Sequence, residues 1–311
     1  DIAKFAYREI DTFYTRMMEK QGGVAHFNEL EELFELPVSK YNEINETRHE
    51  LVLLKRLWDF QFMVASTFDD WKGVTWADAG DMLDDLEYRT RSLSKQIKVL
   101  GNSPGNAIMK GWGVFKFIEA SVKNMSIVLP LISDLRSPAM RDRHWKSLLT
   151  ACRAAGKVDV RGQNFSLGDL IGLELHLHVD DVAEVVETAS KELKIENKLL
   201  NIEEAWTGMT LDYVQHKDQE GMFVVKPPDI VVESLEAHQL ELQTMIGMGK
   251  FVAYFGDRVH QWQQKLGNVE STLREWMSVS KQWASLEAIF LGSKDIRAQL
   301  PDDTKRFESI D

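Results

Sequence analysis

The sequence predicts a mainly α-helical protein, an elongated array of helical bundles with one small β-hairpin. Three observations predict this class. The chain has 19 glycines and 7 prolines in 311 residues, fewer than the roughly 12% of average usage, which disfavours a turn-rich β protein. Apolar residues recur at three- and four-residue steps in several segments, as on one face of a helix. Near the C-terminus these steps become a heptad pattern that extends over about forty residues.

The first half of the chain contains three predicted helices. The first has apolar residues at helical spacing, namely Leu51, Leu54, Trp58, Phe62 and Ala65. A second extends from about Trp76 to Leu100 and ends at the loop Gly101–Gly105. A third is expected from about Ala107 to Val128, with Phe115, Val122 and Met125 buried beside Trp112. Pro130 and Pro138 then bracket a short connector.

The middle of the chain predicts a loop and a long helix. Gly156–Gly168 is polar and contains glycine, which is typical of a loop, and Ser166 to Asp169 are expected to cap a short helix. The long helix begins at a cap formed by Asp180 or Asp181 and ends at Gly208.

A short β-hairpin is predicted near residues 210–227. Leu211, Tyr213 and Gln215 alternate with polar neighbours, and Met222–Val225 is apolar and rich in valine. The intervening Lys217–Gly221 has the composition of a hairpin loop, and Pro227 and Pro228 stop the second strand. This hairpin interrupts an otherwise helical chain.

The C-terminal region carries the strongest periodicity. Seven residues follow one another at seven-residue steps, namely Met248, Phe255, Trp262, Val269, Trp276, Trp283 and Phe290. A companion set is Val252, Val259, Leu266 and Leu273. Gly267–Asn268 could divide this seam into two helices or lie inside one. Because a dimeric coiled coil prefers Leu, Ile and Val at such positions, the tryptophans favour packing within the same chain.

Charge and cysteine content exclude several function classes. The net charge of −12 would repel a nucleic-acid backbone or an anionic membrane, and no Lys/Arg run is long enough to overcome it. The longest uncharged apolar stretch, Met125–Ser133, is too short to span a membrane. Cys152 is the only cysteine, so no intrachain disulfide forms and a cytoplasmic location is expected. The first residue is Asp1 rather than Met, which suggests a fragment or a processed product.

Two glycine motifs resemble catalytic or nucleotide-binding sites but lack essential groups. Gly101–Gly105 matches G-x-S-x-G, yet the residue after the serine is Pro104, which has no N–H for an oxyanion hole. Gly247–Phe251 resembles the end of a P-loop. It lacks the earlier glycine, since position 244 is Thr, and Phe251 replaces the Ser or Thr that would bind Mg²⁺. We therefore expect no catalytic residue and no cofactor in this chain.

Two further groups are weighed against ordinary structural roles. His176 and His178 could share a metal if they lay on a strand, with Asp180 and Asp181 as further ligands, but helix or loop histidines are the favoured interpretation. A basic cluster precedes and surrounds Trp145, and its members are Arg136, Arg141, Arg143 and His144. It could contact an acidic partner or simply form the solvated start of a helix.

Several longer segments resemble signatures of dynein heavy chains. They are Leu129–Ile132 with Leu135–Trp145, Lys191–Glu196 with Leu200, Ile202 and Trp206, and Trp262–Leu266 with Trp276, Gln282–Trp283, Leu286–Phe290, Gln299–Pro301 and Phe307. They occur in order over Leu51–Asp311. Asp295–Pro301 and Leu135–Trp145 are most similar to axonemal chains, in particular of the outer-arm type.

This resemblance implies a mechanical role. Residues 51–311 would form most of the linker, a lever that arches over the ATP-hydrolysing AAA+ ring, and residues 1–50 the end of the tail. ATP and Mg²⁺ would bind in the ring, after Asp311, and microtubules would be contacted only through the full motor. The implied partners are the ring of the same heavy chain and other dynein chains, in the axoneme of a cilium or flagellum. The expected contact residues are the basic cluster together with Gly221 and Met222 of the hairpin.

Two other classes stay open at this level. A spectrin-like helical scaffold would bind protein partners without responding to nucleotide. A metal-dependent enzyme would use His176 and His178.

Overall fold

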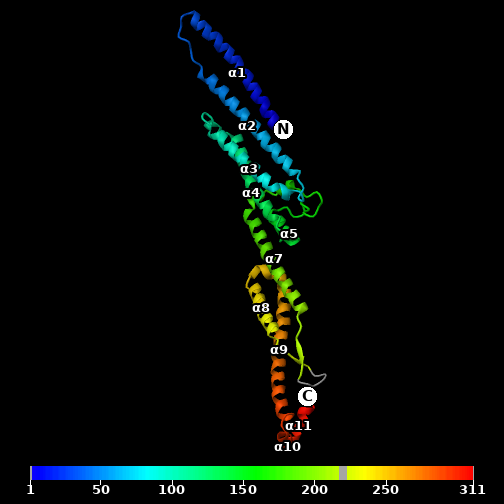
Figure 1. Ribbon diagram of the computed structural model, residues 1–311. Helices are drawn as coiled ribbons and strands as arrows, with labels where there is room; N and C mark the ends of the chain where they lie inside the picture. The colour runs from blue at the N-terminus through cyan, green and yellow to red at the C-terminus, as the bar shows by residue number, and fades with distance from the viewer. Residues whose placement is uncertain (1, 217–222, 311) are drawn as a thin grey trace. The chain divides into compact units, whose positions relative to one another are not determined.

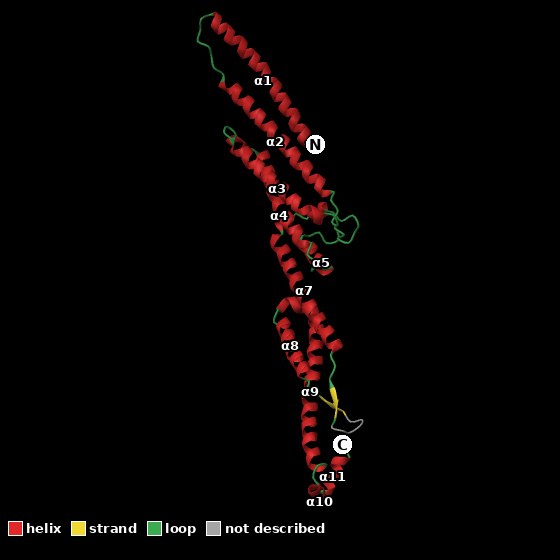
Figure 2. Cartoon of the chain, viewed as in Figure 1, coloured by secondary structure: helices red, strands yellow, loops and turns green. Residues whose placement is uncertain are grey.

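The computed structural model describes residues 2–216 and 223–310. It divides into two compact units, Asp1–Ala189 and Ser190–Asp311, with the division inside helix α7 (Val179–Gly208). Helices dominate both units, as Figure 1 and Figure 2 show, and the described residues contain a single two-stranded sheet. The predicted mainly α fold with one small hairpin is confirmed.

The described part of the first unit contains six helices before α7, together with two short 3₁₀ segments. In chain order they are α1 (Ile2–Leu33), α2 (Asn42–Lys72), α3 (Ala79–Asn102), η1 (Ala107–Gly111), α4 (Gly113–Leu135), α5 (Asp142–Ala151), α6 (Leu167–Ile171) and η2 (Leu175–Leu177).

Helices α1 and α2 pack side by side as an antiparallel pair (Figure 1). Ile10 and Met17 are the buried apolar residues of α1. The Tyr7 hydroxyl donates a hydrogen bond to Asp59 Oδ1 over 2.7 Å. Burial and this carboxylate both disfavour the phenolate, which raises the pKa of Tyr7 to about 12. Arg48 Nη2 of α2 also donates a hydrogen bond to Gln21 Oε1 of α1. The pair is therefore held by apolar contact and by polar links between α1 and α2.

The predicted α2 helix is present, but it buries a different face. The buried residues are Leu53, Leu57, Val64, Phe68 and Trp71, not the predicted stripe. Phe62 of that stripe is 59% exposed. The physical reason is that α2 contacts α1 along part of its length and α4 and α6 elsewhere, so no single 3.6-residue stripe describes its contacts.

Helix α4 continues through the predicted break at Pro130. It begins at Gly113, after η1, rather than at Ala107, and it ends at Leu135 rather than at Val128. Proline costs about 3 kcal/mol inside a helix. Here Leu129, Leu131 and Ile132 around Pro130 are all buried, and each large apolar side chain contributes about 1.5–3 kcal/mol when buried. Packing therefore outweighs the lost hydrogen bond, and the expected connector begins only after Leu135.

A short helix, α6, begins where the sequence predicts it. Ser166 Oγ accepts a hydrogen bond from the Asp169 N–H at 3.4 Å, and Asp169 Oδ2 accepts from the Ser166 N–H at 2.9 Å. This capping box satisfies two of the free donors at the helix start. Gly168 lets α6 approach α2 closely, because a Cβ there would lie 2.8 Å from the Lys72 carbonyl oxygen.

Helix α7 ends at Gly208 as predicted, but it begins at Val179. Asp180 and Asp181 lie in its first turn instead of at the cap. Carboxylates in this position still favour the helix, because they face the positive end of its dipole.

The second unit contains the later part of α7 and four further helices. They are α8 (Asp229–Ile246), α9 (Gly256–Phe290), α10 (Lys294–Gln299) and α11 (Pro301–Glu308), with the 3₁₀ segment η3 (Gly249–Phe255) before α9. Their core consists of Ile195, Leu199, Ile202, Leu242, Met245, Phe255, Val259 and Leu266. These residues come from α7, α8, η3 and α9, so the second unit has a core of its own.

The predicted C-terminal seam lies on one continuous helix. Helix α9 runs through Gly267–Asn268 without a break, which settles the choice between one helix and two. Its buried apolar side chains are Val259, Leu266 and Leu273 of the companion set, next to Phe255. Trp276, by contrast, is 53% exposed. The seam is thus buried along the N-terminal part of α9, and from Trp276 onward part of it is exposed to solvent.

The hairpin is present at the predicted place. Strand β1 (Tyr213–Gln215) pairs antiparallel with β2 (Phe223–Val225), and Tyr213 lies opposite Val225. Tyr213 and Phe223 share one face and meet edge to face at 5.4 Å. The predicted loop, Lys217–Gly221, lies outside the described residues.

Within residues 2–216 and 223–310, no helix has both the length and the apolar character needed to cross a membrane.

The loop between α1 and α2 generates a prediction about pH. The Glu31 carboxylate accepts hydrogen bonds from the Ser39 N–H at 2.7 Å and the Ser39 hydroxyl at 2.8 Å, and these lower the pKa of Glu31 from its ordinary value. A lowered pKa means that the contact stabilises the fold above the pKa of the unfolded chain and is lost as pH falls through the folded value. We expect the Ser39 amide NMR shift to titrate with a midpoint below that of a glutamate without hydrogen-bond partners.

The matched variant is Glu31→Gln, which should abolish this titration of the Ser39 amide. A midpoint at or above that of a glutamate without such partners, measured in the unmodified chain, would contradict the assigned contact.

Candidate functional site

The basic cluster lies where α4 ends and α5 begins. Arg136 follows α4 directly, and Arg141 is the residue before α5. Arg143 and His144 lie in the first turn of α5. The sequence offers these four as partner-contact residues, and the structure gives them different environments.

Arg136 forms contacts inside the first unit. Its Nη1 donates a hydrogen bond to the Trp76 carbonyl oxygen at 2.6 Å, and its guanidinium carbon lies 5.2 Å from the centre of the Trp76 ring. Gly80 leaves the space for it, since a Cβ there would lie 2.2 Å from Arg136 Nη2. A hydrogen bond and a cation–π contact together fix the end of α4 against the segment before α3.

Three aromatic rings join around Trp76. Trp76 and Trp145 meet edge to face at 5.8 Å, Trp76 and Phe165 lie 5.5 Å apart, and Trp145 and Phe165 are 6.0 Å apart. We call these three rings the aromatic junction. The backbone N–H of Trp76 also donates a hydrogen bond to the backbone carbonyl oxygen of Phe165 at 2.8 Å. Aromatic pairs of this geometry each add about 0.5–1.5 kcal/mol beyond burial, so the junction joins three separate segments of the chain.

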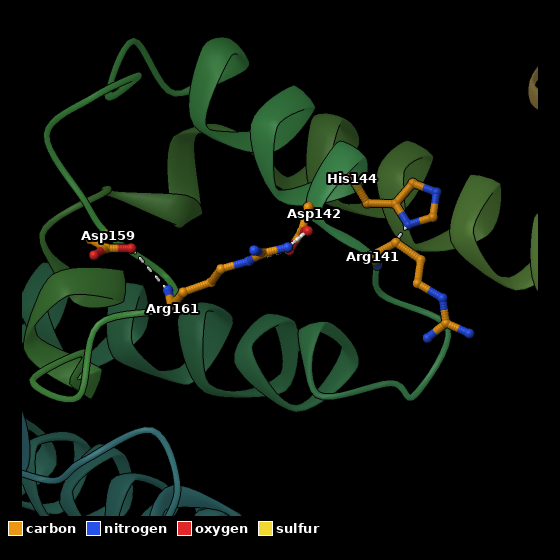
Figure 3. A network of polar contacts seen from close by, with 5 residues as sticks. All are labelled: Arg141, Asp142, His144, Asp159 and Arg161. Carbon is orange, nitrogen blue, oxygen red and sulfur yellow. Dashed lines mark hydrogen bonds and ion pairs between the residues drawn. The ribbon is translucent and has the colours of Figure 1, made fainter.

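His144 is turned inward. Its side chain is buried, and its Nδ1 accepts a hydrogen bond from the Arg141 N–H at 3.0 Å, as Figure 3 shows. This bond satisfies a free donor at the start of α5. The Arg141 side chain points away from the neighbouring Asp142 in the same view, and its Nη1 donates to the Pro138 carbonyl oxygen at 3.0 Å.

An ion pair that sequence reasoning missed lies beside the cluster. Arg161 Nε donates to Asp142 Oδ1 at 2.8 Å, and Arg161 Nη2 also contacts Asp142 Oδ2 (Figure 3). The backbone N–H of Arg161 donates a hydrogen bond to Asp159 Oδ1 at 3.1 Å. A two-point guanidinium–carboxylate contact fixes geometry better than a single one. This ion pair ties the loop before α6 to the start of α5. The two residues are 19 positions apart, and no sequence pattern indicates that they meet.

The cluster is therefore not one surface patch. His144 is buried, and Arg143 is half-buried with interactions of its own. Arg136 and Arg141 are both exposed, and Arg136 contacts Trp76. Gly221 and Met222, the other expected contact residues, lie outside the described residues.

In the second unit, a buried polar pair attaches the hairpin to α9. His216 directly follows β1, and its Nε2 lies 3.0 Å from Glu287 Oε1. Glu287 is only 5% exposed. The His216 ring also meets Trp283 of α9 at 4.9 Å. A buried carboxylate requires a partner, so this contact fixes one strand end against α9. No spacing rule links residues this far apart in the sequence.

His176 and His178 do not form a metal site with their neighbours. His176 lies in η2, and His178 Nδ1 is 2.9 Å from Asp181 Oδ2. In the part of the chain that the structure describes, no group of three or more His, Cys, Asp or Glu residues is arranged to hold a metal ion. Cys152 is partly buried, and burial together with the charge of Asp181 raises the pKa of its thiol. The thiol is therefore protonated near neutral pH and is a weak nucleophile.

A groove of about 890 Å³ lies in the first unit between the start of α1, the second half of α2 and the start of α4. Its lining includes Trp58, Phe62, Val114 and Phe117. The lining also includes Asp69 and Asp70, so the groove suits an apolar side chain or a helix better than an anionic substrate.

Comparisons with known proteins identify relatives over nearly the whole chain. The family model described as "Dynein heavy chain, N-terminal region 2" matches residues 44–311. The "Dynein beta chain, flagellar outer arm" of Chlamydomonas reinhardtii is 40% identical over 317 residues, 99% of this chain and 7% of the relative. The "Dynein beta chain, ciliary" of Heliocidaris crassispina is 33% identical over 305 residues, 98% of this chain and 7% of the relative.

A human relative, "Dynein axonemal heavy chain 17", is 34% identical over 278 residues, 89% of this chain and 6% of the relative. This chain thus spans about 7% of the length of the relatives it matches.

The packing of Arg136 gives a testable prediction. Arg136→Ala removes the hydrogen bond to Trp76 and the cation–π contact, and should lower the free energy of unfolding by about 1–3 kcal/mol in urea denaturation. Gly80→Ala should also destabilise, because the new methyl group displaces the guanidinium. The double variant should cost less than the two single effects added together, since both remove one contact.

Arg89→Ala is the matched control, because Arg89 makes only an exposed ion pair with Asp85, worth roughly 0–1 kcal/mol. An Arg136→Ala effect as small as that of Arg89→Ala would show that the contacts of Arg136 with Trp76 do not stabilise the fold.

Proposed function

The chain belongs to the dynein heavy chain family, and from this premise we propose that residues 51–311 form most of the linker, the lever between tail and ring. Residues 1–50 are then the end of the tail. The observation that carries the proposal is the family-model match, which covers residues 44–311 in the N-terminal part of the heavy chain. The lever moves when ATP is bound and hydrolysed elsewhere in the heavy chain, and so drives movement along a microtubule.

The physical character of the two units supports this role. A lever must transmit force without compressing, and close-packed protein cores are poorly compressible. Each unit has such a core. Helix α9 adds 35 residues of continuous helix. Stiff bodies of this kind are what a mechanical element needs.

A lever also needs a place where the backbone can change direction. The candidates are Gly101–Gly105, Gly156–Gly168 and Gly208–Pro228. The first two lie within the first unit and the third within the second. The aromatic junction and the Asp142–Arg161 pair restrain the loop 156–168. These contacts disfavour the loop 156–168 as the point of bending.

We place the working site of the protein in the axoneme of a cilium or flagellum, because the relatives carry the words flagellar, ciliary and axonemal in their names. The chain itself carries out no catalysis in this proposal. ATP and Mg²⁺ bind in the ring, and other dynein chains and the microtubule are reached through the full motor. The exposed Arg141, with Arg143 and the hairpin, contacts the ring or another dynein chain.

The coupling proposal is tested by weakening the core of the second unit. Leu266 is 1% exposed, and Leu→Ala at such a site costs about 2–5 kcal/mol. In a full heavy chain, Leu266→Ala should slow microtubule gliding and leave basal ATP turnover intact, because a softer lever transmits less of each stroke. The control is Leu240→Ala, since Leu240 is 65% exposed.

Unchanged gliding velocity, with thermal denaturation showing that Leu266→Ala does destabilise the chain, would favour a static scaffold over a lever.

A further inference from the structure

The C-terminal half of α9 carries an apolar stripe, which we call the α9 stripe. Its members alternate at three- and four-residue steps, and they are Trp276, Val279, Trp283, Leu286 and Phe290. This spacing places all five on one face of the helix. Trp276 is 53%, Val279 59% and Leu286 42% exposed. A contiguous exposed face of large apolar side chains marks a contact surface more often than an ordinary solvated one.

Two members of the stripe already have partners within the second unit. Trp283 packs against the His216 ring at 4.9 Å. Phe290 stacks on Phe307 of α11, with 5.6 Å between the ring centres and 24° between the planes. Phe307 is only 6% exposed. The end of the stripe is therefore covered by a segment that follows α9 in the same chain.

The path of that segment leads toward the uncovered part. After α9 the chain turns through α10, and α11 comes back beside the end of α9, as Figure 1 shows. A segment continuing in this direction would pass Leu286 first, then Val279 and Trp276. Phe290 and Trp276 are separated by four helical turns, about 21 Å at 1.5 Å per residue. A helix of about 14 residues would cover this length.

The flanks of the stripe suit an interior contact. Along its open part they carry Ser280, Gln282 and Ile289, and the charged residues there are Glu275 and Glu287, the second of which is buried against His216. The chain as a whole is 28% charged. Permanent contacts are apolar and poor in charge, whereas the rims of contacts with separate partners are polar. The composition therefore favours a segment of the same polypeptide over a separate, electrostatically guided partner.

We propose that the α9 stripe is the docking site for the stretch of the heavy chain that directly follows Asp311, bound as an amphipathic helix antiparallel to α9. The inference uses the family membership of the chain and relatives of which it spans only about 7%. It does not depend on the lever function, because a static heavy chain would need the same cover for its apolar face.

The test is photo-crosslinking in a full heavy chain. Val279→p-benzoylphenylalanine places the crosslinker in the centre of the uncovered stripe. Lys281→p-benzoylphenylalanine is the matched control, since this position is exposed on the opposite face of α9. Irradiated protein is digested, and the crosslinked peptides are identified by mass spectrometry. Microtubule-stimulated ATP turnover verifies that each variant is folded.

We expect the position 279 crosslinker to capture a peptide within about 40 residues after Asp311, and the position 281 crosslinker not to capture it. A mixture of isotopically labelled and unlabelled heavy chains must give products within one chain only. Capture of a second copy, of another dynein chain or of any other stretch of the heavy chain would overturn the proposal, and so would the absence of a specific product. Each of these results would leave the gliding test of the lever unaffected.

Discussion

Burial of the α4 apolar face is the interaction on which the first unit depends. Helix α4 buries nine side chains from Phe115 to Leu135 and contacts α2, α3 and both 3₁₀ segments. The burial of these side chains stabilises α4 enough to keep Pro130 inside the helix, although a proline in a helix interior ordinarily destabilises the helix by about 3 kcal/mol. The continuation past Pro130 carries Arg136 to Trp76, and so brings the aromatic junction together. If the helix ended at Pro130, Arg136 would not be held beside Trp76, and the loop before α6 would lose the contact of Phe165 with a fixed Trp76.

The polar contacts extend this core outward. Arg136 joins the end of α4 to the segment before α3, and Asp142 with Arg161 joins α5 to the loop before α6. In the second unit, His216 and Glu287 attach the hairpin to α9 in the same way. An isolated two-stranded hairpin is marginally stable in water, so this buried pair gives the hairpin a fixed place. Together these contacts turn loops into parts of stiff bodies, as the proposed lever would require.

Local patterns predicted most of the helices, and tertiary contacts explain the errors. The Ser166–Asp169 cap, the Gly208 helix end and the hairpin strands were predictable because each depends on residues close in sequence. The buried face of α2 and the passage of α4 through Pro130 were not, because both depend on helices far away in the chain. The basic cluster was visible in the sequence, but the contact of Arg136 with Trp76 and the burial of His144 depend on residues that only the fold brings together. The heptad pattern near the C-terminus indicated one packed seam, whereas only its first part is packed in the described residues.

The central claim is that this chain moves as a lever when the motor binds and hydrolyses ATP. The most direct measurement is fluorescence resonance energy transfer in a heavy chain that carries both this segment and the ATP-binding ring, with one label on α1 and one on the ring. The account predicts that the distance between the labels changes when ATP is added, and that a variant unable to bind ATP shows no change. A constant distance in a motor that still moves microtubules would contradict the lever and leave a static tether.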